Sequence, residues 1–225
     1  MGSAIRAVIF DMDGVLTDSE PLICAAATAM FHEKGLDVRP GDFHPFVGMG
    51  ENRYIGGVAE AYGLSLDIVE AKRRTYEIYL ERVPTELRAF PGATDLVRAC
   101  RQAGLRAAVA SSADRVKVDA NLEAIGLPRD GWDGIVTAED AERRKPHPDL
   151  FLTAARRMGV EPRACAVLED APSGIEAARA AGMRCVAVAT TFPKDRLAAA
   201  DIVRPAIAAV TLPDLAGPGF ARAGG

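Results

Sequence analysis

The chain has 225 residues, of which 49% are hydrophobic, and a formal net charge of −4 at pH 7. This acidic balance argues against a protein that mainly binds nucleic acid or an anionic membrane surface, and no apolar run reaches the ~18 residues of a membrane span. None of the four cysteines forms a Cys-x-x-Cys pair, so we expect buried, reduced thiols.

The first predicted element is a short apolar strand at residues 7–10, which ends in an acidic stretch, "DMDGVLTDSE". Residues 19–87 differ in character from the rest of the chain. The segments "PLICAAATAMFHEKG" and "DIVEAKRRTYEIYLERV" have the spacing of amphipathic helices, and no convincing strand lies between them. We therefore predict that residues 19–87 form an all-helical insert. The segment "AFPGA" at residues 89–93 returns the chain to its core.

From residue 89 onward, helical patterns that end in glycine alternate with apolar strands. The strands are "LRAAVAS", "GIVTAE", "RACAVLED" and "RCVAVAT". This alternation is typical of βαβ units and a parallel sheet. Ser173 and Glu176 have the spacing of a capping box at the start of one helix. We predict an α/β fold: a Rossmann-like, doubly wound parallel sheet core (residues 1–18 and 88–225) with an inserted all-helical cap domain (residues 19–87).

Polar residues follow the predicted strands where ligands bind in open parallel sheets, beyond the carboxyl ends. Four of them are carboxylates: Asp11, Asp13, Glu169 and Asp170. Ser111 follows another strand, and Lys145 lies in the loop "ERRKPHPD". An oxygen-rich set without histidine or cysteine favours Mg²⁺ over Zn²⁺. A cation, a lysine and a hydroxyl around carboxylates are the groups that phosphoryl transfer needs.

The two aspartates at positions 11 and 13 are suited to different tasks. One carboxylate can attack phosphorus and form an aspartyl-phosphate. The other can protonate the leaving oxygen and later accept a proton from water. A single group does both poorly, because attack needs an ionised carboxylate and acid catalysis needs a protonated one.

Four motifs, in this order and spacing, resemble those of the haloacid dehalogenase superfamily: "DMDGV", "ASS", "KPHPD" and "EDAPSG". The resemblance covers residues 5–213. The helical insert is similar to the small cap of the subgroup that includes β-phosphoglucomutase and phosphoglycolate phosphatase. A more specific resemblance, carried by "FVGMGENRYIGGVAEAYG", "EIYLERV" and "VASSADRVKVDANLEAIGL", is to the domain of this family within a thylakoid protein of plants and algae.

The resemblance implies a role for each matching position. Asp11 would be the nucleophile and a Mg²⁺ ligand, and Asp13 the general acid and base, with its carbonyl on Mg²⁺. Lys145 would bridge the nucleophile and the phosphate. Asp170 would bind the metal directly, and Glu169 indirectly or as a second ligand. The phosphate would be held by Met12, Ser111, Ser112 and Ala113.

The cap departs from the mutase pattern. Where β-phosphoglucomutase carries Ser-Arg, this chain has Gly50-Glu51, and the mutase's Ser-Lys pair after the second motif is Ala113-Asp114 here. Glycines cluster at positions 48–57, and we interpret this stretch as a substrate-facing loop. Its candidate specificity residues are Glu51, Asn52 and Arg53.

These observations predict a Mg²⁺-dependent phosphatase that hydrolyses a small phosphorylated metabolite through an aspartyl-phosphate. The alternatives are a sugar phosphomutase of the β-phosphoglucomutase type and a non-catalytic binding or regulatory module of the same fold. We expect a monomer with no nucleic-acid partner and no membrane span. We expect it to be soluble and cytoplasmic, or in the chloroplast stroma if the source is a plant or an alga.

Overall fold

The computed structural model of the chain describes residues 4–217. These residues divide into two compact units, one of residues 4–18 and 89–217 and the other of Ser19–Arg88. Among the described residues, no helix is long and apolar enough to cross a membrane.

The larger unit contains a six-stranded parallel sheet within the described residues. Its strands are β1 (Ala7–Phe10), β2 (Arg106–Ala110), β3 (Gly134–Val136), β4 (Cys165–Glu169), β5 (Arg184–Val188) and β6 (Ile202–Arg204). The strand order is β3-β2-β1-β4-β5-β6, and every neighbouring pair is parallel. The order reverses direction after β3, so the sheet is doubly wound as predicted.

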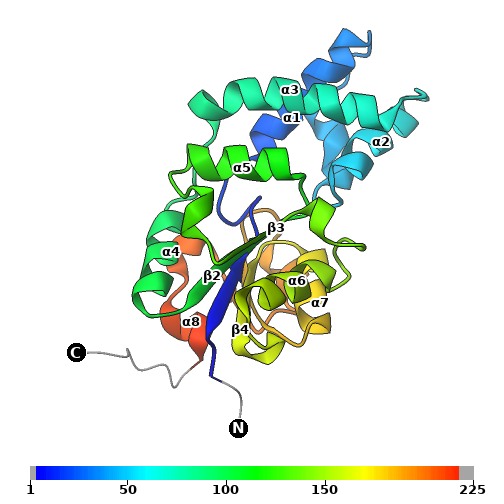
Figure 1. The fold of residues 1–225 in the computed structure, drawn as a ribbon. Helices are drawn as coiled ribbons and strands as arrows, with labels where there is room; N and C mark the ends of the chain where they lie inside the picture. The colour runs from blue at the N-terminus through cyan, green and yellow to red at the C-terminus, as the bar shows by residue number, and fades with distance from the viewer. Residues whose placement is uncertain (1–3, 218–225) are drawn as a thin grey trace. The chain divides into compact units, whose positions relative to one another are not determined.

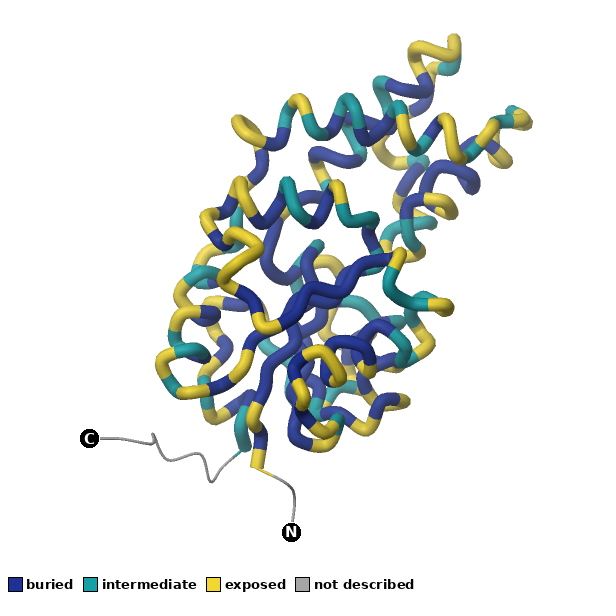
Figure 2. The backbone as a smooth tube through the Cα atoms, in the orientation of Figure 1, coloured by how far each residue is buried: buried dark blue, intermediate teal, exposed yellow. Residues whose placement is uncertain are grey.

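Helices cover both faces of this sheet (Figure 1). They are α4 (Ala93–Gln102), α6 (Asp149–Met158), α7 (Pro172–Ala180) and α8 (Leu212–Ala216), whereas α5 (Arg115–Ala124) packs on the 3₁₀ segment η2 (Arg129–Gly131). Helix α6 packs on β1, β2 and β3 and α7 on β4 and β5, whereas α4 and α8 lie on the opposite face. The central strands are apolar at nearly every position because both faces are covered. Figure 2 shows these strands as continuous buried segments.

All regular elements of the smaller unit are helical. It contains α1 (Glu20–Glu33), the 3₁₀ segment η1 (Pro40–Phe46), α2 (Glu51–Ala61) and α3 (Ile68–Glu86). Its core includes an aromatic cluster: the rings of Phe43 and Tyr54 stack with centroids 4.8 Å apart, and Phe31 packs on Phe43 at 6.0 Å. The helical content agrees with the pattern of the sequence, whereas the role of this unit as a cap stays a prediction.

Three local expectations differ from the structure. Residues 51–57, interpreted as part of a substrate-facing loop, lie in α2, in which the missing side chain of Gly57 admits the Phe46 ring. Strand β6 was not predicted, since its three residues are too few to show a period. The capping box at Ser173 and Glu176 was wrong, because α7 begins at Pro172 and its N-cap residue is Ala171.

Candidate active site

The strand register brings the predicted site residues to one edge of the sheet. Phe10, the last residue of β1, pairs with Val109 of β2 and with Leu168 of β4. The next residues along these strands therefore lie side by side, and the backbone N–H of Asp11 donates to the carbonyl of Leu168 at 3.0 Å. Parallel pairing thus places Asp11 between the ends of β2 and β4.

Lys145 contacts a carboxylate from each of the two acidic motifs, "DMDGV" and "EDAPSG". Its Nζ contacts Oδ1 of Asp11 and Oε1 of Glu169 and lies 3.5 Å from the carbonyl oxygen of Ala110. All three ionisable side chains are less than 10% exposed. Although burial acts against the charged form, Asp11 and Glu169 raise the pKa of Lys145, so the ammonium stays charged.

Glu169 is oriented by the protein through both of its carboxylate oxygens. Oε1 accepts from Lys145, and Oε2 accepts from the backbone N–H groups of Asp170 and Ala171, each at 2.9 Å. The close approach of α7 to the Glu169 side chain depends on Gly174, because a Cβ there would lie 1.9 Å from Cδ of Glu169. Both carboxylate oxygens of Glu169 are therefore engaged within the protein, and its role toward the metal, indirect or as a second ligand, stays a prediction.

Asp170 lies beside Gly14 and Thr191, neither of which was predicted from the sequence to belong to the site. A Cβ on Gly14 would meet Oδ2 of Asp170, and a hydrogen bond from Thr191 acts on the same carboxylate. Thr191 follows β5, and its neighbour Thr190 donates to the carbonyl of Gly14. The signal that could have identified them was the pair of threonines at the end of the predicted strand "RCVAVAT" and directly after it.

The buried carboxylates outnumber their cationic partner. Burial raises the pKa of the Asp11 carboxyl to about 7, against the lowering effect of Lys145. Burial, followed by the negative charges of Glu169 and Asp11, raises the pKa of Asp170 well above its usual range. Three carboxylates face one ammonium, so when all are ionised the site carries two uncompensated negative charges. A divalent cation with a preference for oxygen fits this excess.

The donors available to such a cation are few. Within residues 4–217, no group of three or more His, Cys, Asp or Glu side chains has an arrangement that could hold a metal. This finding follows from the contacts above, because Glu169 is turned to Lys145 and the carboxylate of Asp13 lies 2.8 Å from Nζ of Lys117. Asp11 and Asp170 therefore remain the side chains that would hold Mg²⁺, and the backbone carbonyl of Asp13 is a further oxygen donor from the same turn.

The predicted phosphate-binding positions fall into two groups. Ser111 is buried, and its Oγ accepts the backbone N–H of Ala113 at 3.1 Å, so this amide is engaged within the loop. Ser112 is half-buried between them. Met12 is fully buried, and its carbonyl accepts from Leu16 and Thr17, which closes the turn after β1. The roles of these groups toward phosphate stay predictions.

The other candidate substrate residues lie in the first turn of α2. Glu51 is buried, whereas Asn52 and Arg53 are exposed. Arg53 pairs with Glu60 at 2.7 Å and lies over the ring of Phe46 at 5.2 Å. Arg53 is thus engaged within its own unit, and a role for these three residues in specificity stays a prediction.

Comparison with known proteins gives one consistent result. Residues 5–182 match the model of the haloacid dehalogenase-like hydrolases. The chain is 47% identical over 218 residues to the Arabidopsis thaliana protein SUPPRESSOR OF QUENCHING 1, chloroplastic; the match covers 94% of this chain but 20% of that protein. It is 29% identical to hexitol phosphatase B of Escherichia coli, covering 95% of this chain and 97% of that one.

A solved structure shows the same architecture. CbbY from Rhodobacter sphaeroides, crystallised in complex with phosphate, superimposes with a TM-score of 0.85 at 28% identity. The alignment covers 94% of this chain and 99% of CbbY. These comparisons confirm the predicted family resemblance and the predicted fold class.

Proposed function

The chain belongs to the haloacid dehalogenase-like hydrolase family, and we propose that within it this protein is a Mg²⁺-dependent phosphatase of a small phosphorylated metabolite. The observation that carries the proposal is the bridge from Asp11 through Lys145 to Glu169, buried at the carboxyl ends of β1 and β4. It holds one carboxylate ready for attack beside a fixed positive charge. The hexitol phosphatase relative and the phosphate bound to CbbY support this assignment.

In the first step, an oxygen of Asp11 forms a bond to phosphorus as the bond from phosphorus to the leaving oxygen breaks. Lys145 fixes the plane of the Asp11 carboxylate through Oδ1. Its ammonium also lies where negative charge collects on the phosphoryl oxygens. Asp13 gives its proton to the leaving oxygen, so the departing group leaves as a neutral alcohol. The product is an aspartyl-phosphate on Asp11.

In the second step, water attacks the phosphorus of the aspartyl-phosphate. Asp13, now a carboxylate, accepts a proton from this water as the new oxygen–phosphorus bond forms. The bond from phosphorus to Asp11 then breaks, which returns the carboxylate and releases inorganic phosphate. Mg²⁺, held by Asp11, Asp170 and the Asp13 carbonyl, would supply a second positive charge against the phosphoryl oxygens in both steps.

The test is phosphate release from a panel of phosphorylated metabolites, with Mg²⁺ and with a chelator present. We expect Mg²⁺-dependent release by the wild type and a loss of at least about 10³-fold in Asp11→Asn, which removes the nucleophile without a change of shape. Asp95→Asn is the matched control, because Asp95 pairs with Arg98 on an exposed helix face. Full-rate turnover by Asp11→Asn would contradict the nucleophile assignment.

The same panel separates the alternatives. β-Glucose 1-phosphate converted to glucose 6-phosphate without free phosphate would identify a mutase, against the departures at Gly50-Glu51 and Ala113-Asp114. No turnover, together with tight binding of phosphate, would favour a binding module of the same fold. The name of the Arabidopsis relative includes the word chloroplastic, and we propose the chloroplast as the compartment of this protein if its source is a plant or an alga. We propose a monomer, which sedimentation would test.

A further inference from the structure

A buried lysine that the motifs do not include contacts the proposed general acid. Lys117, in the first turn of α5, has 4% of its side chain exposed, and its Nζ lies 2.8 Å from Oδ2 of Asp13. Lysine is almost never fully buried unless it is paired, because removing an ammonium from water is costly. The contact joins segments 104 residues apart in sequence. Sequence reasoning gave no signal for it beyond a helical pattern.

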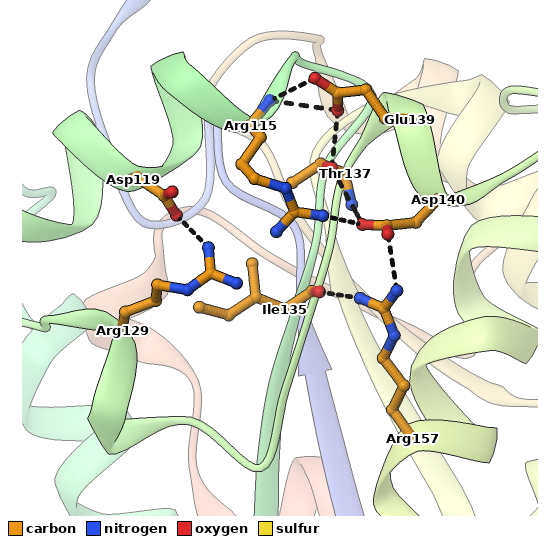
Figure 3. Close-up of polar contacts among 8 residues, drawn as sticks. All are labelled: Arg115, Asp119, Arg129, Ile135, Thr137, Glu139, Asp140 and Arg157. Atoms are coloured by element: carbon orange, nitrogen blue, oxygen red, sulfur yellow. Dashed lines mark hydrogen bonds and ion pairs between the residues drawn. The ribbon is translucent and has the colours of Figure 1, made fainter.

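The helix that carries Lys117 is fixed at its first turn. The backbone N–H of Arg115 donates to both carboxylate oxygens of Glu139, at 3.0 and 3.1 Å (Figure 3). The guanidinium of Arg115 pairs with Asp140 at 2.7 Å, and Asp140 also accepts from Arg157 at 2.6 Å. Carboxylates at a helix N-terminus satisfy its unpaired N–H groups and its dipole. Lys117 therefore extends from a start that is anchored to the segment after β3.

Asp13, in contrast, lies in an irregular turn. It is three residues past the end of β1, and its side chain is 33% exposed. Proton transfer needs a heavy-atom distance of about 2.6–3.2 Å to the reacting oxygen, and a displacement of about 1 Å can cost about 10²-fold in rate. A carboxylate on such a turn needs an external contact to hold its orientation. The ion pair at Oδ2 is a contact of this kind.

We propose that Lys117 is a positioning residue for the reaction: it holds the Asp13 carboxyl group in the orientation required for proton transfer. This inference rests on the proposed function, in which Asp13 protonates the leaving oxygen. Lys117 lies one turn after Ala113-Asp114, the two residues that replace the Ser-Lys pair of the mutase pattern.

The leaving group of the substrate reports this role. p-Nitrophenolate is a stable anion and departs with little help from an acid, whereas the alkoxide of glycerol 2-phosphate needs the proton. The constant kcat/KM covers the steps up to departure of the leaving group, and kcat includes hydrolysis of the aspartyl-phosphate. Replacing a lysine that only stabilises the fold would lower kcat/KM for both substrates by the same factor. Replacing a lysine that positions Asp13 would lower kcat/KM far more for glycerol 2-phosphate than for p-nitrophenyl phosphate.

The experiment compares Lys117→Met, Lys117→Arg, Asp13→Asn and the double variant Lys117→Met/Asp13→Asn. We expect Lys117→Met to lower kcat/KM for glycerol 2-phosphate by about 10²-fold and for p-nitrophenyl phosphate by less than about 10-fold. Lys117→Arg, which keeps the cation, should recover part of the loss. The double variant should be no slower than Asp13→Asn, because both changes disable one group. Asp119→Asn, which breaks the ion pair of α5 with Arg129, is the control and should retain wild-type rates.

Equal losses for the two esters in Lys117→Met, or additive losses in the double variant, would overturn the inference. Crystal structures of the wild type and of Lys117→Met provide a readout that needs no turnover. We expect the Asp13 carboxyl to rotate when Lys117 is replaced, and an unchanged orientation would also overturn the inference. If the wild type hydrolyses neither ester, the metabolite panel decides the proposed function, and the crystallographic comparison still decides the role of Lys117.

Discussion

A Cβ atom on Gly14 would lie 1.9 Å from Oδ2 of Asp170 and 2.7 Å from Oγ1 of Thr191. Gly14 also has φ of 83°, a left-handed conformation that residues with a side chain rarely adopt. The turn after the two N-terminal aspartates is therefore pressed against the last acidic motif. This relationship explains why the motif continues Asp-Gly: the backbone must approach a carboxylate that no side chain would allow it to reach.

The first prediction concerns this approach. In Gly14→Ala the new methyl group must displace Asp170, so we expect Mg²⁺ affinity or turnover to fall by at least about 10²-fold. The left-handed alanine should in addition lower the free energy of unfolding by about 1 kcal/mol. Gly104→Ala is the matched control, because Gly104 has φ of 77° but no atom within 4 Å of the position that a methyl group would take. Chemical denaturation and a Mg²⁺ titration separate the effects. Equal behaviour of the two variants would contradict the proposed contact.

The architecture and the main site residues were predictable from the sequence because their causes are local. Apolar strands that end in carboxylates, and helices that end in glycine, define βαβ units without reference to distant residues. Parallel pairing then brings the strand ends together, so Asp11, Ser111 and Glu169 converge through topology alone. Membership of the family confirmed the resemblance that these motifs carry.

Contacts between distant segments were not predictable in this way. In the sequence, Lys117 looks like any lysine on an amphipathic helix. Its burial depends on the placement of α5, whose start is fixed by Glu139 and Asp140. Thr191 follows β5 in a loop whose path depends on the neighbouring strands. The two oxygens of Glu169 face Lys145 and the N-terminus of α7, an orientation that depends on how closely α7 packs. Tertiary packing decided each of these contacts, and only the two threonines after β5 left a signal in the sequence.

The second prediction separates the two adjacent acids of the last motif. Asp170→Asn removes one of the two side chains that would hold Mg²⁺, so we expect the Mg²⁺ concentration for half-maximal activity to rise by about 10-fold or more. Glu169→Gln instead weakens the partner of Lys145 and should lower kcat with a smaller change in Mg²⁺ requirement. Activity titrations of both variants against Mg²⁺ make the comparison. An unchanged titration in Asp170→Asn would remove Asp170 from the metal site.

The third prediction concerns stability at the end of the sheet. Hydrogen bonding by Arg204 lowers the pKa of the Asp214 carboxyl to about 2, and Thr211 donates to the same carboxylate through its backbone N–H and its hydroxyl, each at 2.9 Å. A lowered carboxyl pKa stabilises the folded state above the unfolded pKa, and this stabilisation is lost as pH falls from about 4 to about 2. Asp214→Asn should therefore destabilise the protein at neutral pH by about 1–3 kcal/mol and flatten its acid unfolding. Identical urea midpoints for both proteins at neutral pH would contradict this expectation.

The last prediction links pH to metal binding through Asp11, whose carboxyl faces Lys145, Glu169, Asp13 and Asp170. Burial raises its pKa to about 7, so the metal-free protein loses stability as pH rises from about 4 towards about 7, where the buried carboxyl becomes charged. Mg²⁺ binds the charged form, and below about pH 7 it must first displace a proton. The increase in melting temperature on adding Mg²⁺ should therefore grow between about pH 5 and about pH 8. Calorimetry in buffers of different ionisation enthalpy should detect the released proton at the lower pH, and Asp11→Asn should abolish it. A Mg²⁺-induced shift that is the same at both pH values would show that Asp11 is not protonated in the metal-free site.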